Sequence, residues 1–312
     1  KVGGNIVSSS FEHPATRSAA QHWASQTGRQ YINVQHEDSN GDVTAQHYAQ
    51  IVNPDTRIVT ILHASPVTGI SVDLEAIATT IRSIAPEAFI IVDGVQYAAH
   101  GGIKIDQYNI DGYAISPYKM YSRHGYGFAW VSDRLTQMNH EQLLDGPNEN
   151  WELGTRDTGS YATISDVVEY LEWLGGKIEN TDSRYLKLHN ASKAIAAQET
   201  ALTNLMINGE DNINGLKDLE GIEIIGGEKN PNRKGLVSFK INGTSSHAIV
   251  KFLNEKAIRT HVRKADHYSG NILNPLGWED CVRVSVCHYN SSEEIKLLLL
   301  ALNEFQLGPP TN

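Results

Sequence analysis

Two residues that could do chemistry together follow two short apolar runs within residues 88–127. The run 89–92 (FIIV) is apolar and largely β-branched, which is typical of a strand buried on both faces, and Asp93 follows it directly. A second run, 112–116, is followed closely by Lys119. Ligands bind beyond the carboxyl ends of the strands in an open α/β sheet, so we expect Asp93 and Lys119 to face one site.

Elements that could position these residues alternate along the first half of the chain. Alternating strands and helices predict βαβ units and a mainly parallel sheet with right-handed crossovers. The expected strands are 5–10, 31–34, 57–63, 89–92 and 112–116, and the expected helices are 15–26, 45–51 and 74–84, with a turn at 40–42.

The second half of the chain predicts a connector and a smaller α/β domain. We expect a helix that is capped near Asp157, runs to Leu174 and is broken by Gly175 and Gly176, followed by a long helix at 182–206. The domains are then 1–180 and 181–312. The expected C-terminal elements are strands 222–225, 236–241, 258–262 and 282–287 and helices 245–256 and 292–305.

The amino-acid composition narrows the range of possible binding partners. The net charge of -10 over 312 residues provides no basic surplus for nucleic acid or an acidic membrane, and the longest apolar run, 297–302, is far short of a membrane span. Cys281 and Cys287 lie in one expected strand, where they would be roughly 20 Å apart, beyond disulfide reach. We therefore expect free thiols and a soluble cytoplasmic protein that binds a small molecule or a protein.

Motifs for several common chemistries are absent. The sequence has no G-x-G-x-x-G after a strand, no G-x-x-x-x-G-K-[ST], no G-x-S-x-G and no zinc-like histidine pair, so we predict no metal site. Taken singly, Lys119 would be read as a surface lysine and Asp93 as part of a turn. Together they are what pyridoxal phosphate requires: a lysine for the Schiff base and a carboxylate that keeps the pyridine nitrogen protonated.

On these residues the chain resembles, over nearly its whole length, the class V aminotransferase and cysteine desulfurase group of fold-type I pyridoxal phosphate enzymes. The resemblance implies a large, mainly parallel sheet domain with a smaller C-terminal α/β domain, an amino-acid substrate, and a homodimer with shared active sites. The segments that carry it are Val92-Asp93-Gly94-Val95-Gln96 with His100, Ser116-Pro117-Tyr118-Lys119, Glu152-Leu153-Gly154-Thr155, Arg283-Val284-Ser285 and Tyr289-Asn290.

The resemblance also implies roles at the cofactor ring. Lys119 would form the Schiff base and, once freed, move the α-proton. Asp93 would pair with the pyridinium, and Gln96 would donate to the phenolic oxygen of the ring. His13 matches the position that stacks on the ring, although a histidine at a helix start is the alternative interpretation.

Further implied roles concern the phosphate and the substrate. Ser116 would contact the phosphate, as would Thr155 from the partner subunit, and either could instead be an ordinary cap. Arg283 would hold the substrate α-carboxylate in a bidentate pair, with an exposed arginine on an edge strand as the alternative.

Departures from the family pattern affect the reaction type. Tyr268 stands where the desulfurases carry their mobile cysteine, which disfavours a persulfide route. Tyr118 replaces the usual histidine before the lysine, and Pro66 replaces an asparagine. Family members also carry a phosphate-binding segment before the equivalent of Asn5, so we expect the full gene product to extend before Lys1.

Several functions therefore stay open. Transamination, carbon–sulfur lysis and epimerisation share the early steps at the α-carbon. A cysteine desulfurase or selenocysteine lyase that works by direct elimination is the runner-up. A truncated, non-catalytic relative that acts as a binding module is the alternative from a different class.

Overall fold

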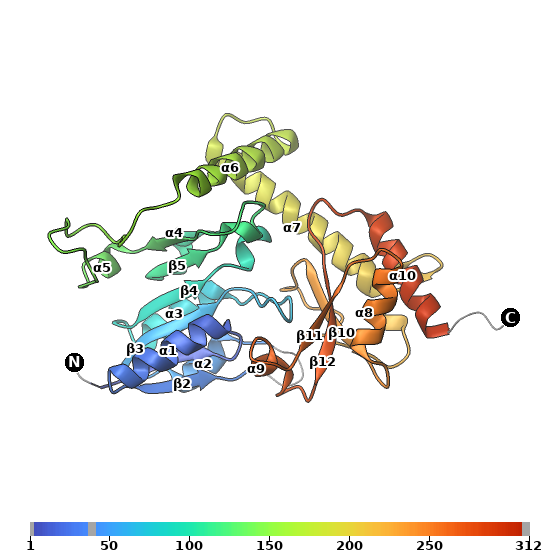
Figure 1. Ribbon diagram of the computed structural model, residues 1–312, viewed down its shortest axis with the longest axis horizontal. Coiled ribbons are helices and arrows are strands. Elements are labelled where there is room, and N and C mark those ends of the chain that lie inside the picture. The colour runs from blue at the N-terminus through green and yellow to red at the C-terminus, as the bar shows by residue number, and fades with distance from the viewer. Residues whose placement is uncertain (1–2, 37–41, 308–312) are drawn as a thin grey trace.

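The computed structural model describes residues 3–36 and 42–307, and its N-terminal half is built on a six-stranded sheet (Figure 1). The strand order is β2-β1-β3-β4-β5-β6, and all neighbours are parallel except the pair β5 and β6. The predicted mainly parallel sheet is therefore present, with one antiparallel edge strand. The strands are β1 (Asn5–Ser9), β2 (Gln30–Val34), β3 (Thr56–Leu62), β4 (Phe89–Asp93), β5 (Gly112–Ile115) and β6 (Phe128–Val131).

Helices link these strands and enclose the main core. Helix α3 begins after an aspartate cap, and Ile77 and Ile81 on its buried face join the β4 residues Ile90 and Val92 in one cluster. This packing fixes the end of β4, where the first candidate residue lies. The helices of this half are α1 (Pro14–Gln26), α2 (Ala45–Ile51), α3 (Leu74–Ile84), α4 (Ile105–Tyr108) and α5 (Asp133–Thr136), with 3-10 turns η1 (Tyr97–Ala99) and η2 (Pro117–Lys119).

A smaller antiparallel sheet of order β11-β12-β10-β9 forms the other half, with a core of its own (Figure 1). The predicted strand 258–262 is displaced to β11 (His261–Lys264), and the predicted strand 282–287 begins and ends two residues earlier. Pairing of Val262 with Val282 sets this register, which local apolar pattern alone does not fix. The other elements are β7 (Gly209–Glu210), β8 (Ile213–Asn214), η3 (Leu216–Asp218), β9 (Ile222–Ile224), β10 (Leu236–Ile241), α8 (Ser246–Glu255), α9 (Gly270–Leu273), β12 (Asp280–Ser285) and α10 (Ser292–Leu307).

Two long helices follow the first sheet in the chain and pack against each other, namely α6 (Thr158–Ile178) and α7 (Arg184–Asn208), and α7 leads to the smaller sheet (Figure 1). Asp157 caps α6 as predicted, but the predicted break at Gly175 and Gly176 is wrong because the helix continues to Ile178. A side chain at Gly175 would collide with the backbone carbonyl of Lys187 on α7. The glycine therefore permits close helix packing, and it does not end the helix.

Two further predictions have different outcomes. The predicted domain division between residues 180 and 181 falls in the short turn between α6 and α7, and it stays a proposal.

Most of the predicted turn at 40–42 lies outside the described residues. Within the described part of the chain, no helix combines the length and apolar character needed to cross a membrane.

Candidate functional site

Asp93 closes strand β4, and its backbone pairs with Leu62 of β3 and Ala114 of β5. The backbone N–H of Val95 donates to Asp93 Oδ1 at 3.0 Å, which fixes the carboxylate at the strand end. Gly94 follows because any larger side chain would collide with the ring of Tyr113. Burial raises the pKa of Asp93, and the nearby Lys119 and His13 oppose that rise.

Lys119 ends the 3-10 turn that follows β5, the strand beside β4. Its Nζ donates to Oε1 of Gln96 at 3.1 Å. Burial lowers the pKa of Lys119, Asp93 raises it, and Arg283 and Arg263 lower it further. Within the described residues, Lys119 and Asp93 interact electrostatically but form no ion pair within 4.0 Å.

His13 caps helix α1, with Nδ1 accepting from the backbone N–H of Ala15 at 3.2 Å. This geometry matches the helix-start interpretation, yet the ring also belongs to the site. Burial lowers the pKa of His13, and both Asp93 and Lys119 act on it electrostatically. The His13 ring centroid lies 6.3 Å from that of Tyr268.

Arg283 approaches from the second sheet. It lies on β12, which is flanked by β11 and β10, so the alternative of an arginine on an edge strand is wrong. Its Nη1 donates to the Pro66 carbonyl at 3.1 Å, and its buried Nε has no hydrogen-bond partner. Arg263 on β11 has the same unpartnered buried Nε and also acts on Lys119.

Sequence reasoning missed Arg263, and the β-sheet register explains why. Arg263 pairs with Cys281, two residues before Arg283 on the neighbouring strand. A correct prediction of β11 would have placed both arginines close together, but the predicted strand 258–262 ended one residue before Arg263.

The two predicted phosphate contacts differ in position. The Ser116 carbonyl accepts from the Lys119 backbone N–H at 3.0 Å, so Ser116 lies at the site. Thr155 is exposed between α5 and α6 and lines a hollow with Asn150 and Tyr161. No interaction of the described residues joins Thr155 to Lys119. The roles predicted for both residues stay predictions.

Glu12, a second acidic residue near Asp93, was not singled out from the sequence. It is 1% exposed, and Oε1 accepts from Ser9 Oγ at 3.0 Å and from the Leu62 backbone N–H at 2.7 Å. Burial, reinforced by Asp93, raises the pKa of Glu12 to about 8. Glu12 is therefore expected to be protonated at neutral pH, which leaves Asp93 as the anion at this strand end.

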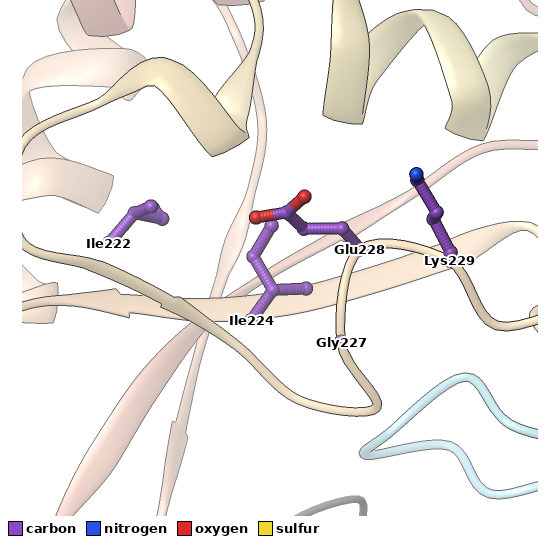
Figure 2. A pocket seen from close by; sticks show the side chains of 5 residues that line it. All are labelled: Ile222, Ile224, Gly227, Glu228 and Lys229. Atoms are coloured by element: carbon purple, nitrogen blue, oxygen red, sulfur yellow. The ribbon is translucent and has the colours of Figure 1, made fainter.

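Other parts of the molecule offer less chemistry. Among the described residues, no group of histidine, cysteine and acidic side chains could hold a metal ion. Figure 2 shows a hollow lined by Ile222, Ile224, Gly227, Glu228 and Lys229, beside edge strand β9 of the smaller sheet. It contains none of the predicted site residues. The chemical groups therefore gather between the end of the parallel sheet and strands β11 and β12.

This arrangement agrees with the family comparison. The family model described as "Aminotransferase class-V" matches residues 1–298. The chain belongs to this family. A probable cysteine desulfurase from Pseudomonas putida is 26% identical over 320 residues, which cover 97% of this chain and 72% of the relative. The cysteine desulfurase-like protein ustD of Aspergillus flavus is 26% identical over 318 residues, which cover 96% of this chain and 67% of the relative.

Solved structures show the same fold. The cysteine desulfurase CsdA of Escherichia coli superposes with a TM-score of 0.78 at 22% identity, covering 97% of this chain and 72% of CsdA. The cysteine desulfurase of Thermococcus onnurineus gives a TM-score of 0.80 at 22% identity, covering 99% of this chain and 74% of that one. The predicted α/β fold, with a mainly parallel sheet and a smaller sheet, is confirmed. The family uses pyridoxal phosphate, and a related C-DES structure holds glycine linked to that cofactor.

Proposed function

We propose that this chain is a pyridoxal phosphate enzyme that acts at the α-carbon of an amino acid through a Schiff base on Lys119. The observation that carries the proposal is the placement of Asp93 and Lys119 at the ends of neighbouring strands, with Gln96 bonded to the lysine. The two charges interact without forming an ion pair. A carboxylate and an amine are the groups that a ring with a cationic nitrogen and an aldehyde carbon requires.

The remaining groups of the site fit the same cofactor and its substrate. The unpartnered buried Nε atoms of Arg263 and Arg283 are donors that an anionic ligand would satisfy. His13 would lie against the ring, and Ser116, with Thr155 of a second subunit, would contact the phosphate. When bound, pyridoxal phosphate supplies an electron sink that makes the α-proton of an amino acid acidic.

The protein groups then have separate tasks. Arg283 would hold the substrate carboxylate with a guanidinium whose position is fixed by the Pro66 carbonyl. Lys119 would take and return the α-proton, and its lowered pKa favours the neutral amine that this task needs. Asp93 would remain the counter-ion of the ring nitrogen, because Val95 fixes its carboxylate.

The proposed reaction is transamination, carbon–sulfur lysis or epimerisation, which share these steps. Direct elimination from cysteine or selenocysteine is the second candidate. Burial raises the pKa of Cys281 to about 12 and also raises the pKa of Cys287, so neither thiol readily forms the thiolate that a persulfide route needs. Tyr268 aligns with the mobile cysteine of the desulfurases, so this chain has no thiol at that position. The tyrosine is 52% exposed and its ring lies near that of His13.

The test is an absorbance titration of the complete gene product with pyridoxal phosphate. A Schiff-base band should form, borohydride should trap the adduct on Lys119, and Lys119→Ala should abolish both. Lys104→Ala, which removes an exposed lysine, is the matched control and should keep them. If the wild-type chain gives neither the band nor the trapped adduct, the enzyme proposal fails and a non-catalytic binding module is favoured.

We also propose a homodimer and a cytoplasmic location. Several large apolar side chains are exposed between β6 and α7, which is typical of a surface that a second subunit covers. They include Trp130, Leu144, Trp151, Trp173 and Tyr185. Light scattering coupled to size exclusion tests the dimer, since a monomer at micromolar concentration would contradict it. Cell fractionation tests the location.

A further inference from the structure

Three buried or half-buried side chains form a line of polar contacts that starts at Lys119 and ends on helix α7. They are Gln96, His100 and Glu199. Gln96 Oε1 accepts from Lys119, and Gln96 Nε2 lies 2.9 Å from Nε2 of His100. His100 Nδ1 in turn lies 3.0 Å and 2.9 Å from the two carboxylate oxygens of Glu199. His100 is 6% exposed and Glu199 only 1%. The line therefore runs from helix α7 to the reactive amine almost without water.

The hydrogen bonds along this line fix one pattern of donors and acceptors. Lys119 donates to Gln96 Oε1, so the NH₂ group of Gln96 faces His100 Nε2. An NH₂ group only donates, so His100 Nε2 accepts and the ring proton lies on Nδ1, toward the Glu199 carboxylate. A carboxylate that accepts from Nδ1 therefore keeps the Gln96 carbonyl oxygen facing Lys119. Reversing the Gln96 amide would place its NH₂ group against the lysine nitrogen.

We propose that Glu199 and His100 are positioning residues for Lys119, acting through the orientation of the Gln96 amide. This inference rests on the proposed role of Lys119 as the reacting amine. The Gln96 oxygen stabilises the protonated amine by accepting from it and holds Nζ at one place while other groups approach. Glu199 sets this orientation without touching Lys119.

The carboxylate of Glu199 is closely surrounded. A side chain at Gly235 would collide with the Val286 carbonyl and would lie 2.9 Å from Glu199 Cδ. Lys234, whose Nζ lies 5.5 Å from the Tyr97 ring centroid, interacts electrostatically with Glu199. The other titratable groups that interact with Glu199 are Tyr121, Cys287, His288 and Tyr289. The carboxylate thus lies where α7, the start of β10 and the segment after β12 meet.

The test is the rate at which Lys119 of the full, cofactor-free chain reacts with acetic anhydride at fixed pH, read by mass spectrometry. Glu199→Leu and His100→Phe should each let the Gln96 amide turn and should each raise the rate about three- to tenfold, because the protonated amine loses its acceptor. Gln198→Ala, which removes a neighbouring α7 hydrogen bond to the Asn290 carbonyl, should leave the rate within about twofold.

Two comparisons separate this role from simple electrostatics. Glu199→Leu removes the carboxylate and His100→Phe leaves it in place, so an effect of the carboxylate alone would appear only in the first variant. In a Gln96→Ala background, Glu199→Leu should produce no further change. An equal effect with and without Gln96 overturns the proposal, as does an unchanged rate in His100→Phe with the melting temperature preserved.

The ring of His100 gives a readout that is independent of Lys119. ¹⁵N NMR of the histidine rings should show the ring proton of His100 on Nδ1 and an accepting Nε2. A ring with the opposite tautomer overturns the proposal even when Lys119 reacts as expected. The proposed function is tested by a different result, because it requires a pyridoxal phosphate adduct at Lys119. The line from Lys119 to Glu199 does not require that adduct.

Discussion

Replacement of Glu12 by glutamine should make the free energy of unfolding less sensitive to pH. The Glu12 carboxyl is buried at the end of β1, where Oε1 accepts two hydrogen bonds and Oε2 has no partner. With its pKa raised to about 8, Glu12 is neutral in the folded protein at pH 7 and ionised in the unfolded chain. Glutamine preserves the size and the accepting oxygen and removes the titration.

The sign and size follow from proton linkage. Between pH 4.5 and about 8 the folded state binds more protons at this site than the unfolded state, so stability falls as pH rises and levels off above about 8. At about 1.4 kcal/mol per unit, the rise from 4.5 to about 8 corresponds to roughly 5 kcal/mol. The carboxyl is 1% exposed, so solvent screens little of this effect.

The assay is urea unfolding at half-unit steps from pH 5 to pH 9. The free energy of unfolding of Glu12→Gln minus that of wild type should increase by at least about 2 kcal/mol between pH 5 and pH 8. Taking the difference cancels the titrating groups that do not interact with Glu12. Glu141→Gln, at an exposed position, should give a flat difference. A flat difference for Glu12→Gln, within about 0.5 kcal/mol, would refute the assignment of a neutral Glu12.

Three further predictions test packing and chemistry. Gly175→Ala should lower the free energy of unfolding by about 1–3 kcal/mol, because the new side chain collides with α7. Gly176→Ala meets only a flexible lysine side chain and should raise the free energy of unfolding by about 0.5–1 kcal/mol. Urea unfolding compares the two variants, and equal effects would contradict the packing argument. Arg283→Ala should raise KM for carboxylate substrates about tenfold or more with a smaller change in kcat, and an unchanged KM sinks that assignment. If the chain releases sulfide from cysteine, Cys281→Ser and Cys287→Ser should keep the rate within about twofold, and loss of activity would support a persulfide route instead.

Sequence pattern located the first part of the site because parallel strands impose their own geometry. Buried strands carry continuous apolar runs, and their carboxyl ends meet at one edge, so Asp93 and Lys119 could be placed together from two short runs. The structure sets them at adjacent strand ends, as β4 pairs with β5. Their catalytic roles stay predictions that the Schiff-base experiment tests.

Long-range packing explains what the sequence pattern missed. Glycine is a poor helix former, so the sequence predicts a helix break at Gly175, but contact with α7 overrides that preference. Glu199 lies 99 residues from His100, and helical periodicity alone cannot show which buried polar residue of a long helix will meet a distant loop. Arg263 was missed because antiparallel register depends on pairing with another strand.

The local charge of the site differs from that of the whole molecule. The chain carries a net charge of -10, yet Lys119, Arg263 and Arg283 act on one another at the site and the pKa of Glu12 keeps that residue neutral. Asp93 acts on Lys119 and Asp266 acts on Arg263 as the opposing acidic groups. Because exposed charges are screened beyond about 10 Å, the acidic surface cancels little of this local field. We therefore expect the site to attract a ligand with a phosphate and a carboxylate even though the net charge of the molecule is of the same sign as the ligand.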